Sequence, residues 1–201
     1  TFSTTNAPDG TKNNPRCPYR TALLGTYTTN ITGISVTNDD KAIAVTFDDA
    51  TATGTKILYS TVADVRKCNF TNVALSPRNG AGTTALPASK VYCSLMEMSD
   101  NKKVFVGTDF GVYYTSDITA TTPVWSDANN GQLPVLQVFD LKQQVMRTWD
   151  CYNSGLIYAA TNGRGIWVNK NFMNTYYVSV AEQEGLVRDN NLSLYPNPTN
   201  G

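Results

Sequence analysis

Between residues 31 and 171, short runs of alternating apolar and polar residues are separated by Asn, Asp and Gly. The clearest runs are ITGISV, KAIAVTF, KILYST, VYCSLM, KVFVGT, GVYYTSD and GLIYAAT. Alternation with a period of two places the apolar side chains on one face, which is typical of β-strands. The interrupting residues favour tight turns. Helical periodicity is scarce, and even LPVLQVFDLKQQ (133–144) favours a strand through its Val and Phe content. The pattern therefore predicts an all-β fold.

The strand runs recur as three copies, at about residues 31–75, 91–127 and 134–171. Aligning Thr46, Thr108 and Thr161 gives spacings of 62 and 53 residues. A four-stranded propeller blade takes ~40–50 residues. In the first copy the last strand is expected at 68–75. In the second copy we expect an inner strand, a turn at 99–102, two further strands joined by a tight turn that Gly107 and Gly111 allow, and an outer strand at 123–127. The spacing predicts β-propeller blades, about two to three in number.

The number of copies sets the expected domain organisation. A propeller usually closes with ~4–8 blades, and a partial ring would leave unpaired sheet edges. We therefore expect further blades upstream of Thr1, and a compact β-sandwich is the structural alternative. The boundaries we predict are an irregular lead-in with one strand (1–30), blades (31–175), a terminal strand and linker (176–191), and a separate tail (192–201).

Charge and composition narrow the functional classes. Charged residues make up 16% of the chain, with 16 basic and 16 acidic side chains, and the remaining polar surface is Thr, Asn and Ser. Without a basic cluster there is no electrostatic footprint for nucleic acid. No apolar run is long enough to span a bilayer, so we expect no transmembrane segment. The composition is typical of an exported β-protein.

The four cysteines, Cys17, Cys68, Cys93 and Cys151, form no CxxC pair, and the chain has no histidine. A zinc site is disfavoured by this scattered spacing. In an exported protein the four could form disulfides with three alternative pairings. Cys93, within the apolar run KVYCSLM, fits a buried thiol equally well.

Candidate chemistry is limited. The absence of histidine excludes nucleophilic catalysis through a His base. Glycoside hydrolysis needs two carboxylates, and Asp140 in VFDL is the one weak candidate, on an inner strand expected to line a central channel. Calcium could be held by oxygen ligands at turns 38–40 or 48–49, although we expect solvated turns there and no cofactor. We expect Asp109 to be structural and Arg164 to pack between blades.

Two motifs resemble a known propeller superfamily. In VFVGTDFGVYYTSD the motif residues are Gly107, Asp109, Gly111, Ser116 and Asp117, with Trp125 following; in TNGRGIW they are Gly163, Arg164, Gly165 and Trp167. The segment resembles the BNR/Asp-box propellers, which include sialidases, sortilin-type receptor propellers and xyloglucanase-like glycoside hydrolases. The Asp-box pattern is Ser-x-Asp-x-Gly-x-x-x-Trp. Here Ser116 and Asp117 are adjacent and Trp125 comes later, so the box is degenerate.

The tail LSLYPNPTNG (192–201) resembles the start of the type A C-terminal sorting domain of the type IX secretion system. The match rests on Leu194, Tyr195, Pro196, Asn197, Pro198 and Gly201. In that family a LYPNP-type first strand opens a small β-sandwich. The resemblance implies export across the outer membrane of a Bacteroidota-type bacterium, with the secretion machinery as partner. The expected location is the cell surface or the extracellular space.

Three functional hypotheses follow. The first, which we favour, is a non-catalytic, adhesin-like scaffold or binding propeller whose partner is a surface glycan or another surface protein. The second is the C-terminal part of a secreted glycoside hydrolase. The third is a subunit of a surface assembly that pairs its sheet edges with a neighbour.

Overall fold

The computed structural model describes residues 26–61, 74–146 and 150–173, and this part of the chain forms three antiparallel sheets. The first sheet contains β1 (Ile31–Val36), β2 (Ala42–Phe47), β3 (Ile57–Thr61) and β4 (Ser76–Pro77). The second contains β5 (Val91–Met96), β6 (Val104–Thr108), β7 (Gly111–Thr115) and β8 (Trp125–Asp127). The third contains β9 (Val138–Gln143), β10 (Ile157–Thr161) and β11 (Ile166–Asn169). A 3-10 turn, η2, spans Gly82–Thr84. The prediction of an all-β fold is confirmed.

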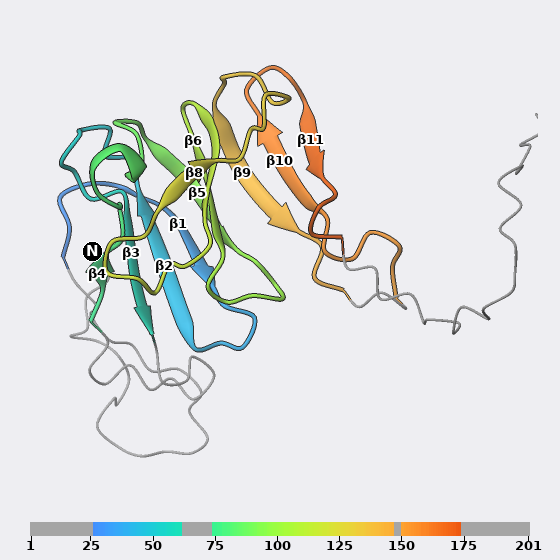
Figure 1. Ribbon diagram of the computed structural model, residues 1–201, viewed down its shortest axis with the longest axis horizontal. Helices are drawn as coiled ribbons and strands as arrows, with labels where there is room; N and C mark the ends of the chain where they lie inside the picture. The colour runs from blue at the N-terminus through green and yellow to red at the C-terminus, as the bar shows by residue number, and fades with distance from the viewer. Residues whose placement is uncertain (1–25, 62–73, 147–149, 174–201) are drawn as a thin grey trace, which may run out of the picture.

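Each sheet is a meander in which consecutive strands are hydrogen-bonded neighbours. The sheets follow one another in chain order and lie side by side (Figure 1). Their first strands, β1, β5 and β9, contact one another in sequence. None of the described segments forms a helix that could cross a membrane.

A hydrophobic core fills the space between the first and second sheets. The buried side chains there are Ala42, Ala44, Ile57, Tyr59, Leu86, Val91, Met96, Val104, Val106, Ile118 and Trp125. Trp125 is 4% exposed, and its Nε1–H donates to the carbonyl of Arg78 at 2.8 Å. The indole therefore lies between two sheets, with its one polar atom satisfied by the neighbouring sheet.

A second core joins the second and third sheets. Its buried members are Cys93, Phe105, Val112, Val138, Leu141, Ile157 and Ala159. The Phe105 ring stacks on Tyr114 at 5.8 Å and meets Phe172 edge-on at 5.1 Å. Tyr113 packs toward the first core and Tyr114 toward the second, as strand alternation requires. Both faces of the second sheet are thus covered.

The three sheets share one irregularity in strand pairing. In each sheet, one residue near the start of the first strand has no partner in the register with the second strand. The skipped residues are Thr32 in the first sheet, Tyr92 in the second and Phe139 in the third. Beside each skip, the last pairs are Ile31↔Phe47, Val91↔Thr108 and Val138↔Thr161. Phe47, not Thr46, therefore aligns with Thr108 and Thr161, so the alignment from sequence is wrong by one residue in the first copy.

The outward faces of the first and third sheets carry exposed apolar side chains. On β1, Ile34 and Val36 are 67% and 40% exposed. They share a face with Ile43 and Val45 through the β1–β2 register. On β11, Ile166 and Val168 are 70% and 45% exposed, on the face that also carries the Asp140–Lys142 ion pair of β9. Neighbouring exposed apolar side chains of this kind are typical of faces that another element covers.

Other strand predictions have mixed outcomes. The run 133–144 contains strand β9, and the predicted outer strand at 123–127 contains β8. In the first sheet the fourth strand is Ser76–Pro77, and most of the run predicted at 68–75 lies outside the described residues. The turn predicted at 99–102 lies one residue later, at 100–103, where Lys103 N–H donates to the Asp100 carbonyl at 2.9 Å. The predicted strands at 21–27 and 176–180 fall largely or wholly outside the described residues.

Gly107 and Gly111 serve different physical purposes. A Cβ on Gly107 would lie 2.5 Å from the Val138 carbonyl oxygen of β9 and 2.7 Å from Cys93 Sγ. Gly111 has φ +108, a conformation that side chains disfavour, and a Cβ there would meet the Asn129 amide. The sequence assigned both glycines to a tight turn. The structure confirms this for Gly111, whereas Gly107 lets the second and third sheets approach.

Gly107→Ala should destabilise the fold by about 1–3 kcal/mol, because the added methyl group must displace the β9 backbone. Urea unfolding would measure the loss. Gly82→Ala is the control: no atom lies within 4 Å of the added Cβ, so its cost is limited to the backbone strain of a left-handed φ of +58, which Gly107 does not have. A loss no larger than that of the control would contradict the close approach of the two sheets.

Candidate functional site

In each of the three sheets, the first strand begins next to the point where the second strand ends. We call this end of the sheets the rim. It consists of residues 30–32, 90–92 and 137–139 together with Asp48, Asp109 and Asn162. Asp48 Oδ1 accepts from Asn30 N–H at 3.2 Å, and Asp109 Oδ2 accepts from Lys90 N–H at 2.9 Å. In the third sheet, Asn162 N–H donates to the Gln137 carbonyl at 2.9 Å. An Asp or Asn therefore closes each sheet at the same place.

A polar network crosses from the second sheet to the third along the rim. The Tyr92 hydroxyl donates to Asp109 Oδ1 at 2.7 Å, and Gln137 Nε2 donates to the same oxygen at 3.1 Å. Gln137 Oε1 in turn accepts from Asn162 Nδ2 at 2.9 Å. These bonds fix the Tyr92 ring and the start of β9 relative to each other.

Two aromatic rings occupy the skipped positions of β5 and β9. Tyr92 and Phe139 meet edge to face, with ring centroids 5.1 Å apart. Phe139 is 46% exposed, and Tyr92 is half-buried. Since the bulge turns each ring out of the regular strand alternation, Phe139 presents a hydrophobic surface that neighbouring polar groups hold in place.

The network shifts the acidity of both of its ionisable members. Burial, the hydrogen bond to Asp109 and the Asp109 charge raise the pKa of Tyr92 to about 12. Burial opposes ionisation of Asp109, but hydrogen bonds from Tyr92, Lys90 and Gln137 outweigh it and hold the pKa of that carboxyl below its usual range. At neutral pH the pair is therefore a neutral phenol bonded to a carboxylate. The prediction that Asp109 is structural agrees with these contacts.

Asp140, the weak catalytic candidate, lies on β9 opposite Ala160. Its Oδ1 accepts from Leu141 N–H at 3.0 Å and forms an ion pair with Lys142 at 3.3 Å. Lys142 shares its strand face, whereas Leu141 between them is buried against the second sheet. Asp140 is thus on the outward face of the third sheet, with a lysine as its charged partner.

The residues compared with an Asp-box, Ser116 and Asp117, lie in the connection between β7 and β8, the third and fourth strands of the second sheet. Asp117 Oδ1 accepts from Thr119 N–H at 2.9 Å, and Asp117 N–H donates to Thr115 Oγ1 at 3.3 Å. Ser116 is exposed. Asp117 is therefore tied into this connection by Thr115 and Thr119.

The TNGRGIW segment forms the β10–β11 hairpin. Gly163 and Gly165 have φ +74 and +73, and Thr161 Oγ1 donates to the Gly165 carbonyl at 2.7 Å. Trp167 packs against the second core. Arg164 is exposed at the turn, so it does not pack between the sheets described here, whereas Trp167 does.

The acidic turns use their carboxylates locally. Asp39 Oδ1 accepts from Thr37 Oγ1 at 2.6 Å, and Asp49 Oδ1 accepts from Thr51 Oγ1 at 2.6 Å. These hydrogen bonds are the leading cause of a lowered pKa in both carboxyls. Within the described ranges, no three Asp, Glu, Cys or His side chains gather in a way that could hold a metal ion.

Cys93 is buried and unbridged, and burial raises its thiol pKa to about 12. Of the two readings left open by the sequence, the buried thiol is the one observed. Cys17 and Cys68 lie outside the described residues, as do all the sorting-signal residues from Leu194 to Gly201.

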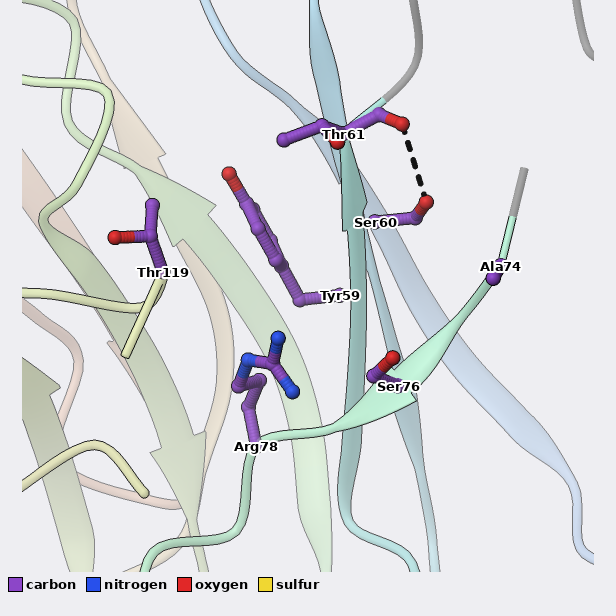
Figure 2. Close-up of a pocket in the computed structure, with 7 residues that line it drawn as sticks. All are labelled: Tyr59, Ser60, Thr61, Ala74, Ser76, Arg78 and Thr119. Carbon is purple, nitrogen blue, oxygen red and sulfur yellow. Dashed lines mark hydrogen bonds between the residues drawn. The ribbon is translucent and has the colours of Figure 1, made fainter. Parts of the chain in front are cut away.

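Apart from the rim, a groove lies between the outer parts of the first and second sheets. This groove, about 350 Å³ in volume, is lined by Tyr59, Ser60, Thr61, Ala74, Ser76, Arg78 and Thr119. Figure 2 shows the Arg78 guanidinium beside the Tyr59 ring, with Ser76 on the neighbouring strand and Thr119 across the groove. The groove could not be predicted from the sequence, because its residues are spread between positions 59 and 119 and Arg78 resembles any isolated arginine.

Comparisons with known proteins assign no family. No protein-family model matches the chain, and no curated protein matches it. Among solved structures, one described as the structure of U3-55K is similar, with a TM-score of 0.49 and 18% sequence identity. The similarity covers 73% of this chain, and the chain spans 38% of the length of that one.

Tyr92→Phe should change how stability depends on alkaline pH. The folded pKa of about 12 lies above the ordinary value of 10.0, so the Tyr92 contribution is full below pH 10 and is lost as pH rises toward 12. At pH 8 the variant should be less stable by about 0.5–1.5 kcal/mol, the worth of one hydrogen bond. By pH 11.5 this deficit should shrink or reverse, as measured by urea unfolding. A deficit that stays constant across this range would contradict the network.

Proposed function

We propose that the three sheets are blades of a β-propeller that acts as a non-catalytic binding and spacing module on a bacterial surface. The observation that carries the proposal is the rim: three successive sheets repeat the same skip, and in each the residue after the second strand, an Asp or Asn, is hydrogen-bonded to the start of the first strand. Repetition of one unit around an axis brings equivalent positions to a common edge. At that edge the second and third sheets present the Tyr92–Phe139 pair.

The outward faces support a larger ring. Ile34 of the first sheet and Ile166 of the third are exposed on faces equivalent to those that are buried between sheets. Further sheets of the same kind would cover them and remove this exposed apolar surface. A ring of ~4–8 blades is the usual way to do so.

The carboxylates favour binding over hydrolysis. A glycosidase acid must hold its proton near neutral pH, which requires a raised pKa. Here local hydrogen bonds lower the pKa values of four carboxyls: Asp39, Asp49, Asp109 and Asp117. Burial acts in the opposite direction in each and is the leading single effect only at Asp109, where the hydrogen bonds together still outweigh it. Such groups accept hydrogen bonds and shape turns.

The rim chemistry fits a neutral glycan. An exposed aromatic ring offers a face for the C–H surface of a sugar, and the adjacent amides of Gln137 and Asn162 offer polar partners at its edge. A chain with formal net charge of zero has no long-range attraction that selects a strongly charged partner.

Binding to a panel of neutral surface polysaccharides, measured by affinity electrophoresis, tests the rim. Phe139→Ala should weaken binding at least tenfold, since it removes the contact face. Tyr152→Ala is the matched control, because Tyr152 is fully exposed in the loop at the opposite end of β9. Release of soluble sugar would instead support the glycoside hydrolase alternative. Equal losses in both variants would contradict a rim site.

Delivery to the surface is the second part of the proposal and rests on the resemblance of residues 192–201 to a type IX sorting domain. Replacing Tyr195, Pro196, Asn197 and Pro198 with alanine in the native gene should trap the protein in the periplasm. Immunoblots of surface, medium and periplasmic fractions would measure this. Unchanged surface delivery would contradict a role for this motif. The same substitution should leave glycan binding by the purified protein intact.

A further inference from the structure

We propose that the groove around Arg78 is a second ligand site, separate from the rim, which takes a carboxylate-bearing sugar such as a uronic acid. The groove lies between the outer strands of the first sheet and the β7–β8 connection of the second. Its volume, about 350 Å³, is within the usual range for small-ligand sites of ~300–1,000 Å³.

The Arg78 guanidinium is held in position from several sides. Nε–H donates to the Ile118 carbonyl at 3.1 Å, and Nη1 donates to the Pro77 carbonyl at 2.9 Å. The guanidinium also lies over the Tyr59 ring, 5.9 Å from its centroid. Because the head group is already ordered, little side-chain entropy is lost when a ligand binds.

The backbone of Arg78 is fixed as well. Its N–H donates to the Ile57 carbonyl at 3.0 Å, and its carbonyl accepts from the Trp125 indole at 2.8 Å. Arg78 thus bridges the first sheet to the second, and its guanidinium is presented from a rigid element.

The positive charge of Arg78 has no ion-pair partner within the described part of the chain. Its two side-chain hydrogen bonds go to neutral carbonyls and use Nε and Nη1, so among the described residues Nη2 has no partner. The Asp117 carboxylate in the β7–β8 connection is not among the groove residues, and its Oδ1 accepts from Thr119 N–H and Oγ1. An unneutralised guanidinium in a concave site attracts a carboxylate and donates to it through a charge-assisted hydrogen bond.

The rest of the groove suits a sugar more than a bare ion. The hydroxyls of Ser76 and Thr61 line it alongside the aromatic Tyr59. Hydroxyls that both donate and accept match the hydroxyls of a pyranose, whereas a small inorganic anion would fill only part of the space. A uronate combines both features in one ring.

Isothermal titration of the whole chain with glucuronate tests the proposal, with glucose and inorganic sulfate as the comparison ligands. Glucuronate should bind at least tenfold more tightly than glucose, because only it pairs with the guanidinium. It should also bind more tightly than sulfate, because sulfate lacks the ring. Equal binding of glucose, or sulfate binding as tight as glucuronate, would overturn the acidic-sugar assignment.

Two variants locate the site. Arg78→Gln should weaken glucuronate binding roughly tenfold or more, the worth of a charge-assisted hydrogen bond. Arg164→Gln, which removes an exposed arginine from the β10–β11 turn, should leave it unchanged. Ser76→Ala, which keeps the charge and the Arg78 contacts, should reduce affinity several-fold even if Arg78→Gln fails to fold. Equal effects of Arg78→Gln and Arg164→Gln, or no effect of Ser76→Ala, would overturn the site. Phe139→Ala should not alter this binding, which separates the groove from the rim.

Discussion

The close approach of neighbouring sheets along their first strands is the constraint on which the rest of the structure depends. Gly107 lacks a side chain where the Val138 carbonyl of β9 would lie 2.5 Å from an added Cβ, so a larger residue there would hold the second and third sheets apart. Between β1 and β5 the backbones also meet, and a Cβ added at Gly33 would be in contact with the Cys93 Cα at 3.4 Å. With the sheets in contact, apolar side chains on their facing surfaces are buried, which drives the folding of each sheet against the next.

The same constraint generates the functional surfaces. Where the first strand of each sheet starts, the skipped residue leaves the regular alternation and its side chain enters the rim, as Tyr92 and Phe139 do. Farther from the first strands, the sheets are bridged by Arg78 and Trp125, and the groove lies beside that bridge. The rim presents aromatic rings beside the Asp109 carboxylate, and the groove is polar with the Arg78 cation. The two regions therefore differ in chemistry, and the ligands that we propose for them differ accordingly.

The sequence was sufficient for the strands because alternation and turn residues are local signals. It placed β1 to β3 and β5 to β11 within its runs, and it found the repetition of the strand unit in three copies. It aligned Thr46 where Phe47 belongs, because a bulge shifts the register without changing the pattern of apolar residues. It also expected Arg164 to pack between blades, whereas Arg164 is exposed among the three sheets described here. The Tyr92–Asp109–Gln137 network and the Arg78 groove depend on contacts between distant segments, for which a single sequence holds no local signal.

The central claim is that these sheets are blades that require neighbours on both outward faces. An experimental structure of the protein isolated intact from its native source tests this most directly. The account predicts further antiparallel sheets packed on β1–β4 and on β9–β11, closing a ring in which Ile34 and Ile166 are buried. A stable monomer that leaves both faces open to solvent, or a sandwich closed by other means, would contradict it.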